Sequence, residues 1–223
     1  MTHDLVLSSS LHSPKPLAVV TCGPASAPID VVRRITNFAT GEIGAILSRA
    51  LLEGGWDVIC LRGEGSTFPA PEGIDVRVFS TNDSLADLFH ALPRTPNAIF
   101  HAAALCDFQI ASIEGVAGMK KIPTRDGALT LHLEPAPKIL PRLREWFPQA
   151  FIVGWKYELD GDRFAALAKA AAQIRECHTN ACVVNGAAYG EGFGILLPDG
   201  TLKEVADKRG LAALLVDYPP AAT

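Results

Sequence analysis

The feature that most constrains the fold of this chain is a series of short, uninterrupted apolar runs separated by segments of helical periodicity. The first run spans residues 16–23 (PLAVVTCG), and similar runs follow at 97–105 (NAIFHAAAL) and 181–185 (ACVVN). A strand reads as a continuous apolar run when both faces of its sheet are covered, which is typical of parallel sheets. We therefore expect an α/β protein with a Rossmann-like, doubly wound and mostly parallel sheet that carries helices on both faces.

The remaining segments extend this pattern along the chain. Apolar residues recur at helical spacing from Ile43 to Leu51, and a Gly-Gly pair at 54–55 ends that helix. A late β-hairpin is expected over 192–206 around the turn PDG, and residues 106–127 are expected to be mostly loop. The other expected strands are 57–63, 73–80, 129–134 and 150–158, and the other expected helices are 82–92, 138–147, 162–177 and 207–218.

Length and charge narrow the class of protein. A chain of 223 residues suits one domain, expected over residues 15–218, with a flexible tail at 1–14 and a short tail at 219–223. The formal net charge of −4 argues against a general nucleic-acid partner, which usually requires a basic protein. The N-terminus has no signal-peptide pattern, and no apolar stretch reaches membrane-spanning length, so no membrane partner is expected.

The five cysteines indicate a reducing compartment. Their number is odd and none form a Cys-x-x-Cys pair, so we expect free thiols in a cytoplasmic protein rather than disulfides or a zinc site. The residues are Cys22, Cys60, Cys106, Cys177 and Cys182.

The segment between the first strand and the first helix is unusually long, since such connections normally take two to six residues. It carries Asp30, Arg33, Arg34 and Asn37, and it ends at Gly41 and Gly44 where the helix begins. Glycines at a helix N-terminus let backbone N–H groups approach an anion, although they can equally serve tight packing of the helix on the sheet. Asp and Asn in such a loop can also only bind local backbone.

Other polar residues follow later strands of the predicted sheet. Ligands in open α/β sheets bind beyond the carboxyl ends of the strands, so these residues are expected at one edge. Each alone has a structural alternative, such as a solvated lysine or an aspartate that caps a turn. Together they favour a negatively charged small-molecule ligand. The residues are Asp107, the loop lysines Lys120 and Lys121, and the strand-end residues Trp155, Lys156 and Asn185.

Several of these segments resemble one family in order and spacing. The stretch CGPASAPIDVVRRITNFATGEIG is similar to the pattern GGT-x-x-P-ID-x-VR-x-I-T-N-x-SSG-x-x-G of phosphopantothenoylcysteine synthetase, also called phosphopantothenate–cysteine ligase. AAALCDF, GWKYELD and ACVVN resemble the later AAAV-x-D-[FY], F-K-x-E-T-D and VVVAN motifs. In KKIPTRDGALTLHLEPAPKIL, Lys121 stands at the position of the loop lysine. The resemblance runs from about Leu17 to the closing helix.

The resemblance implies an enzyme of coenzyme A biosynthesis that joins 4′-phosphopantothenate to cysteine. The carboxylate of 4′-phosphopantothenate attacks the α-phosphate of ATP or CTP, and the amine of cysteine then attacks the acyl-nucleotidate. Lys121 would stabilise charge on the α-phosphate, Asn37 would hold the intermediate, and Arg33 would orient the carboxylate or phosphate. Cationic groups are needed there because two anions must be brought together.

The family also implies the binding set and the partners. Mg²⁺ is expected with the triphosphate, and no residue is assigned as a metal ligand. A homodimer is expected, in which loops and strands of one subunit help to close the site of the other. The chain resembles a stand-alone synthetase domain, so no flavin is expected on it. The residues expected to contact the nucleotide are Gly23, Ser26, Gly41, Gly44, Asp107, Phe108, Trp155, Lys156 and Asn185.

Some departures from the family pattern leave two alternatives open. The opening turn reads GPAS, so Ser26 would have to supply the missing hydroxyl, and Glu42 stands where the family often has a basic residue. Arg175 is the only basic side chain in the stretch where bacterial relatives carry lysines, so the choice between ATP and CTP is not fixed. A catalytically degenerate paralogue that binds a nucleotide or a pantothenate derivative is one alternative. A Rossmann-type oxidoreductase is the other, although no G-x-G-x-x-G follows the first strand.

Overall fold

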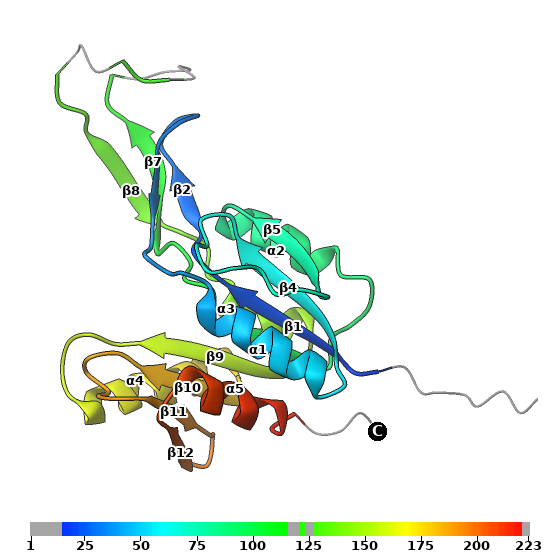
Figure 1. Cartoon of the computed structure of the whole chain (residues 1–223). Coiled ribbons are helices and arrows are strands. Elements are labelled where there is room, and N and C mark those ends of the chain that lie inside the picture. The colour runs from blue at the N-terminus through cyan, green and yellow to red at the C-terminus, as the bar shows by residue number, and fades with distance from the viewer. Residues whose placement is uncertain (1–14, 116–120, 124–126, 220–223) are drawn as a thin grey trace, which may run out of the picture.

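The computed structural model describes residues 15–115, 121–123 and 127–219. Its centre is an eight-stranded sheet with helices on both faces, as expected (Figure 1). The helices are α1 (Glu42–Glu53), α2 (Asn82–His90), α3 (Leu140–Trp146), α4 (Arg163–Cys177) and α5 (Lys208–Val216). The strands of the central sheet are β1 (Leu17–Cys22), β4 (Asp57–Gly63), β5 (Asp75–Phe79), β6 (Ala98–His101), β9 (Phe151–Tyr157), β10 (Ala181–Asn185), β11 (Phe193–Leu196) and β12 (Leu202–Val205).

The strand order is β12-β11-β10-β9-β6-β1-β4-β5. The six strands from β10 to β5 are mutually parallel, and β11 and β12 add the expected antiparallel hairpin at one end. From β1 the chain passes to β4 on one side and later returns to β6 on the other. This reversal places a topological switch point between the carboxyl ends of β1 and β6, where ligands bind in folds of this kind.

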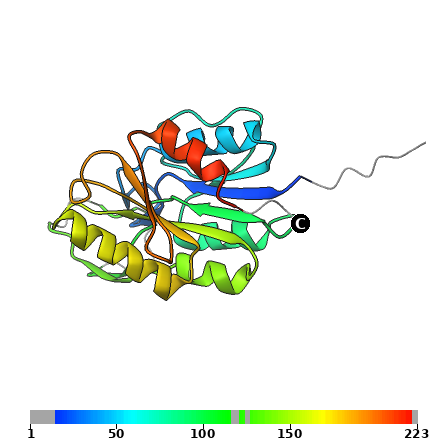
Figure 2. The same ribbon diagram turned by 90° about the horizontal axis from the view of Figure 1, so that it is seen from below.

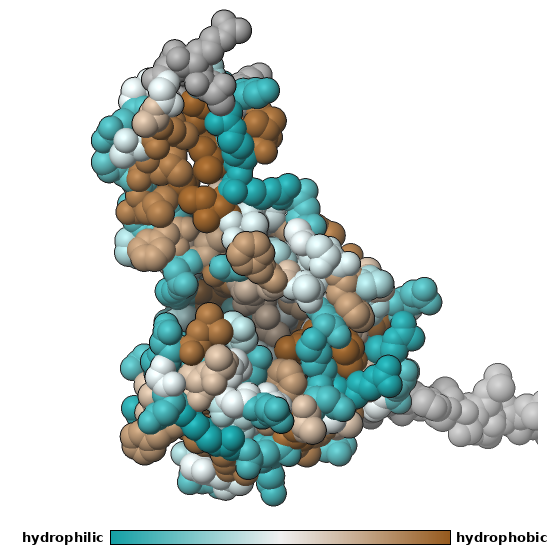
Figure 3. All heavy atoms as spheres, turned by 60° about the vertical axis from the view of Figure 1, so that its left-hand side comes forward, coloured by the Kyte–Doolittle hydropathy of each residue, from teal (hydrophilic) through white to brown (hydrophobic). Residues whose placement is uncertain are grey.

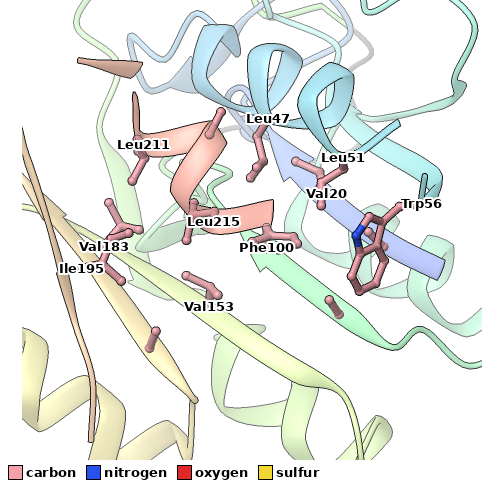
Figure 4. Packing of buried hydrophobic residues seen from close by; sticks show 14 of the residues in the cluster. Val20, Leu47, Leu51, Trp56, Phe100, Val153, Val183, Ile195, Leu211 and Leu215 are labelled. Atoms are coloured by element: carbon pink, nitrogen blue, oxygen red, sulfur yellow. The ribbon is translucent and has the colours of Figure 1, made fainter. Parts of the chain in front are cut away.

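Two layers of helix cover the sheet (Figure 2). On one face α1 and α5 lie side by side and bury their leucines against β1, β6, β9, β10 and β11 (Figure 4). On the other face α2 and α3 cover β1 and β6, and the alanine-rich side of α4 covers β10. The apolar runs of the sequence are thus buried on both sides, which is why they do not alternate. The labelled leucines in Figure 4 are Leu47, Leu51, Leu211 and Leu215.

Two further strand pairs project from the sheet, and we call them together the arm (Figure 1). The long opening segment contains the hairpin β2 (Ser26–Pro28) and β3 (Arg34–Thr36). Next to it lie β7 (Phe108–Ile113) and β8 (Leu131–Pro135), which pair antiparallel. The expectation that 106–127 is mostly loop is therefore wrong for β7. None of the six residues of β7 is buried, so the strand lacks the apolar pattern that marks a buried one.

Candidate functional site at the switch point

The first helix begins with an open N-terminus at the switch point. Gly41 has φ 82° at the N-cap of α1 and offers no side chain to cap the helix, and the Glu42 N–H donates to Thr40 Oγ1 at 3.3 Å. A Cβ at Gly41 would lie 2.9 Å from Ser66 Oγ, and a Cβ at Gly44 would lie 2.2 Å from Cys22 Cβ. Gly44 is thus required for packing α1 on β1, whereas Gly41 shapes the turn. The next N–H groups of the first turn, those of Ile43 and Gly44, and the helix dipole favour an anion at this position.

The predicted residues of the opening turn have separate surroundings. Gly23 has φ 77°, and a Cβ there would lie 1.9 Å from Ser66 Oγ, so the turn leaves no room for a side chain. Ser26 does not lie at the start of α1. Its Oγ donates to Ser80 O at 3.0 Å, and the residue lines a cavity of about 330 Å³ beside the N-terminus of α2. Phe108, half-exposed at the start of β7, lines the same cavity.

Asn37 joins the opening segment to the exit of β6. Its Nδ2 donates to Ala104 O at 3.2 Å and to Leu105 O at 3.0 Å. Asp107 follows on that exit, so the structure brings these two predicted residues into one region. The exposed carboxylate of Asp107 accepts a hydrogen bond from Lys138 Nζ. Lys138 was not singled out from the sequence, although the motif quoted for the family includes its position.

Arg33 and Lys121 lie at the opposite end of the β2–β3 hairpin. The turn of that hairpin closes with hydrogen bonds from Ile29 N and Asp30 N to Arg33 O. Arg33 Nη2 donates to Ile122 O at 2.5 Å, so the backbone beside Lys121 is held at the turn. Asn37, in contrast, follows β3 at the base of the hairpin. Lys120 lies outside the described residues, and Arg34 Nη1 lies 2.8 Å from Glu64 Oε2.

Near the end of β9, the successive side chains of Trp155 and Lys156 point to opposite faces of the central sheet. Trp155 packs against the α1 and α5 layer, and its indole N–H is buried without a partner among the described residues. Lys156 Nζ lies 3.4 Å from Glu158 Oε1. Burial alone would raise the pKa of Glu158, but hydrogen bonds and charge from Lys169 and Lys156 hold it below its ordinary value. Asn185 accepts the Glu158 N–H through its backbone oxygen at 2.9 Å.

Glu42, the acidic departure from the family pattern, has a basic partner. Its Oε2 accepts a hydrogen bond from Lys208 Nζ, which ties the first turns of α1 and α5 together. The two residues are 166 positions apart in the sequence, so no local pattern could have paired them. Lys208 therefore partly neutralises the negative charge beside the start of α1. It also adds a lysine next to the switch point.

The described part of the chain provides no protein cage for a metal ion. It contains no group of three or more His, Cys, Asp or Glu side chains arranged to hold one. Asp107 is the predicted site residue whose carboxylate could contribute to a cation held mainly by phosphate oxygens. All five cysteines are free. Within the same residues, no helix is long and apolar enough to cross a bilayer.

Comparison with protein families identifies relatives over nearly the whole described region. Residues 15–209 match the family model described as DNA/pantothenate metabolism flavoprotein C-terminal domain. The chain is 30% identical to the coenzyme A biosynthesis bifunctional protein CoaBC of Bacillus subtilis over 194 residues, 84% of this chain and 46% of that protein. It is 27% identical to the human phosphopantothenate–cysteine ligase over 203 residues, 65% of this chain and 64% of that protein. The chain thus spans about half the length of the CoaBC relative.

Solved structures share the fold. The DNA/pantothenate metabolism flavoprotein from Streptococcus pneumoniae aligns with a TM-score of 0.79 at 22% identity, covering 92% of this chain and 97% of that one. A Cab2 mutant in complex with phosphopantothenate-cysteine aligns with a TM-score of 0.66 at 22% identity, covering 90% and 83%. At these identities the likeness establishes the overall fold and nothing about ligands.

Proposed function

This chain belongs to the family of the DNA/pantothenate metabolism flavoprotein C-terminal domain, and from that premise we propose that it is a phosphopantothenate–cysteine ligase. The observation that carries the proposal is the family match over residues 15–209, together with curated relatives named for this activity. The open start of α1 at the switch point supports an anionic ligand such as a nucleoside triphosphate.

The proposed reaction has two steps. The carboxylate of 4′-phosphopantothenate attacks the α-phosphorus of the nucleotide, a P–O bond forms, and pyrophosphate leaves. The amine of cysteine then attacks the acyl carbon, an amide bond forms, and the nucleoside monophosphate leaves with the bonding electrons. The first step brings anions together, so donors and cations fixed in place lower its barrier.

We assign the residues to these steps as follows. The N–H groups of the first turn of α1 would donate hydrogen bonds to phosphate oxygens, and Lys208 and Lys138 would supply positive charge. Lys121 would stabilise the charge on the α-phosphate as pyrophosphate departs. The amide of Asn37, fixed by its bonds to the β6 exit, would hold the acyl-nucleotidate for aminolysis.

The remaining predicted residues would line the nucleotide subsite. Gly23 and Gly41 would form its floor, and Asp107 and Phe108 would contact the nucleotide beyond β6. Mg²⁺ would be held chiefly by the triphosphate, where it supplies charge neutralisation. The other proposed contacts come from Trp155, Lys156 and Asn185.

We also propose a homodimer, because the proposed residues divide between two ends of the hairpin. The backbone beside Lys121 is bound at the turn near Arg33, while Asn37 lies at the base. Asn37 is four positions after Arg33, which corresponds to roughly 13 Å of extended chain. The arm of a second copy could carry its Lys121 over the Asn37 region of this one.

The free cysteines further support a cytoplasmic location.

A catalytically degenerate relative is the second candidate. Glu42 favours it, because its carboxylate lies beside the helix end proposed to receive phosphate. An oxidoreductase has less support. In Rossmann-type oxidoreductases, a residue at the end of the second parallel strand binds the adenosine ribose or its 2′-phosphate. The residue near the end of the corresponding strand β4 is Arg62, and its guanidinium already binds the backbone oxygens of Ser66 and Phe68.

One assay separates these functions. The protein is incubated with 4′-phosphopantothenate, cysteine, Mg²⁺ and either ATP or CTP, and pyrophosphate is followed. Release that depends on 4′-phosphopantothenate is the expected result, and the active nucleotide names the cosubstrate. Asn37→Ala should accumulate the acyl-nucleotidate, whereas Lys121→Ala should prevent its formation. Nucleotide binding without pyrophosphate release would favour the degenerate relative.

A further inference from the structure

A buried asparagine at the start of α2 binds two loops that lie far apart in the sequence. Asn82 is 6% exposed. Its Oδ1 accepts the Cys106 N–H at 3.1 Å, and its Nδ2 donates to Cys106 O at 2.9 Å and to Pro137 O at 3.1 Å. These partners fix the orientation of the amide, because exchanging Oδ1 and Nδ2 would place an N–H group against the Cys106 N–H. One side chain therefore holds the backbone of the β6 exit and of the loop before α3.

Each of these loops carries one member of an ion pair directly after the bonded residue. Asp107 directly follows Cys106. Lys138 directly follows Pro137, and its Nζ donates to the Asp107 carboxylate. The loops also meet in the backbone, since Ala136 N donates to Asp107 O at 2.9 Å. Both charged side chains are exposed, so their places depend on the backbone that is held behind them.

The exit of β6 is bound by asparagines on two sides. Asn37 Nδ2, on the side of the arm, donates to the two carbonyl groups that precede Cys106, at 3.2 and 3.0 Å. Asn82, on the side of α2, binds the next carbonyl group, that of Cys106 itself. Three consecutive carbonyl groups thus accept hydrogen bonds from two side-chain amides. The backbone that leads to Asp107 is therefore fixed immediately beyond the switch point.

We propose that Asn82 is a positioning residue for the nucleotide subsite, because it holds Asp107 and Lys138 in register so that the carboxylate and the ammonium meet the nucleotide together. This inference rests on the proposed function, in which Asp107 contacts the nucleotide. Both N–H groups of the Asn82 amide already donate to backbone, so Asn82 acts through the two loops rather than on the ligand. Binding groups work together only when the backbone that carries them is held in place.

The first test measures nucleotide binding at equilibrium and needs no turnover. Calorimetric titration of the full chain with Mg²⁺ and ATP or CTP gives the dissociation constant of the tighter nucleotide. Asn82→Ala should raise this constant roughly tenfold. Asn82→Asp should raise it by a similar factor, because an ionised carboxylate cannot donate to Cys106 O or Pro137 O. The aspartate variant also gives an answer if the alanine variant folds poorly.

Two matched variants separate positioning from a general loosening of the fold. Ser84→Ala removes the capping-box partner of Thr81 in the first turn of α2 and leaves the bonds of Asn82 in place. Asn97→Ala removes another asparagine that binds backbone, at Leu17 N where β1 begins. Both variants should keep the wild-type dissociation constant. An equal rise in Ser84→Ala would overturn the proposal, because the effect would then come from the helix start alone.

The decisive comparison uses a protein that lacks the ion pair. In the double variant Asp107→Ala and Lys138→Ala, the addition of Asn82→Ala should raise the dissociation constant no further, because the groups that Asn82 positions are gone. A further loss as large as that in the wild type would overturn the proposal.

Amide hydrogen exchange, followed by NMR in the intact protein, tests the structural link itself. The Cys106 N–H is bonded to the oxygen of a buried amide. Its exchange should be slow in the wild type and in Asn97→Ala, and about tenfold faster in Asn82→Ala. Equal exchange in all three proteins would refute the link.

Pyrophosphate release distinguishes failure of this inference from failure of the proposed function. If the Asn82 variants weaken nucleotide binding but the wild type releases no pyrophosphate, the ligase function is refuted and the role of Asn82 stands. If the wild type releases pyrophosphate and both Asn82 variants bind the nucleotide as it does, the role of Asn82 is refuted and the ligase function stands. A wild type that binds neither nucleotide would overturn both.

Discussion

At the scale of single residues, the site depends on where a side chain is absent. Gly44 lies in the first turn of α1, where an added Cβ would lie 2.2 Å from Cys22 Cβ on β1. Gly210 occupies the corresponding third position of α5, and there a Cβ would meet its nearest neighbour, Asp207 Oδ1, at 3.4 Å. The glycine in α1 is therefore needed for close packing, whereas the glycine at the same position of α5 leaves room for a side chain.

Substitution of these glycines should give opposite changes in stability. Gly44→Ala brings Cβ within 2.2 Å of Cys22 Cβ, which forces α1 away from β1 and should destabilise the protein by about 2–3 kcal/mol. Gly210→Ala should stabilise it by about 0.5–1 kcal/mol, because alanine loses less entropy in a helix. Urea unfolding measures both. A Gly44→Ala protein as stable as the wild type would contradict the packing role.

A second residue sets a pH dependence of stability. His101, at the end of β6, is buried, and its Nδ1 lies 2.9 Å from Thr21 Oγ1. Burial lowers the pKa of His101 from 6.5 to about 4. Between these values the unfolded chain binds a proton that the folded protein does not, so stability falls as pH decreases through this window.

The expected size of this effect is about 3 kcal/mol between pH 7 and pH 4. Unfolding free energies measured across that range should show a smaller loss in His101→Gln than in the wild type. His132→Gln, which removes an exposed imidazole, is the control and should keep the wild-type loss. An identical slope in His101→Gln would show that His101 is not responsible.

At the scale of elements, the N-termini of α1 and α5 lie together beside the proposed nucleotide site, joined by the Glu42–Lys208 pair, and Asp207 caps the start of α5. Two helix dipoles point their positive ends to the same place, and Lys208 adds a charge that Glu42 partly cancels. Glu42, which departs from the family pattern, therefore lowers the positive charge at these helix ends, but it is paired with Lys208 and is not an isolated anion.

The Glu42–Lys208 pair predicts opposite effects on nucleotide affinity. Glu42→Gln removes the competing anion and should lower KM for the nucleotide roughly threefold, while Lys208→Ala should raise it by a similar factor. Arg209→Ala is the control, because that neighbour is exposed. Steady-state kinetics at low and high salt measure the effect, which should shrink with salt. A higher KM in Glu42→Gln would instead mean that Glu42 helps to bind substrate.

At the scale of the whole molecule, the arm exposes apolar side chains that the central sheet would bury. Figure 3 shows hydrophobic residues gathered on this projection, above a more mixed surface over the sheet. Contiguous exposed apolar area of this kind marks an interaction surface. The residues include Val31, Val32, Ile35, Phe108 and Leu133, which are 40–70% exposed.

The proposed dimer should therefore depend on the arm. Leu133→Asp places a charge on β8, at a residue 47% exposed, and should raise the dimer dissociation constant at least tenfold. Leu159→Asp, at a residue 57% exposed outside the arm, should leave the dimer intact. Analytical ultracentrifugation gives the masses. A wild type that sediments as a monomer at all concentrations would contradict the dimer.

The sequence by itself determined the central fold. Runs such as ACVVN and LAVVTC are apolar throughout because both sheet faces are covered, and amphipathic helices separate them, so element type and order were readable locally. The motif around Asn37 likewise indicated the family, and it directed attention to Asn37 and Gly41 near the switch point and to Arg33 at the far end of the β2–β3 hairpin.

Tertiary structure alone decided which of those residues meet. Strand β7 carries no buried side chain, so only its pairing with β8 reveals it. Asn37 meets the exit of β6, Arg33 meets Ile122, and Glu42 meets Lys208, each across a long stretch of sequence. Local patterns record which face of an element is buried, whereas these contacts arise from strand order and from the path of the arm, which no short segment encodes.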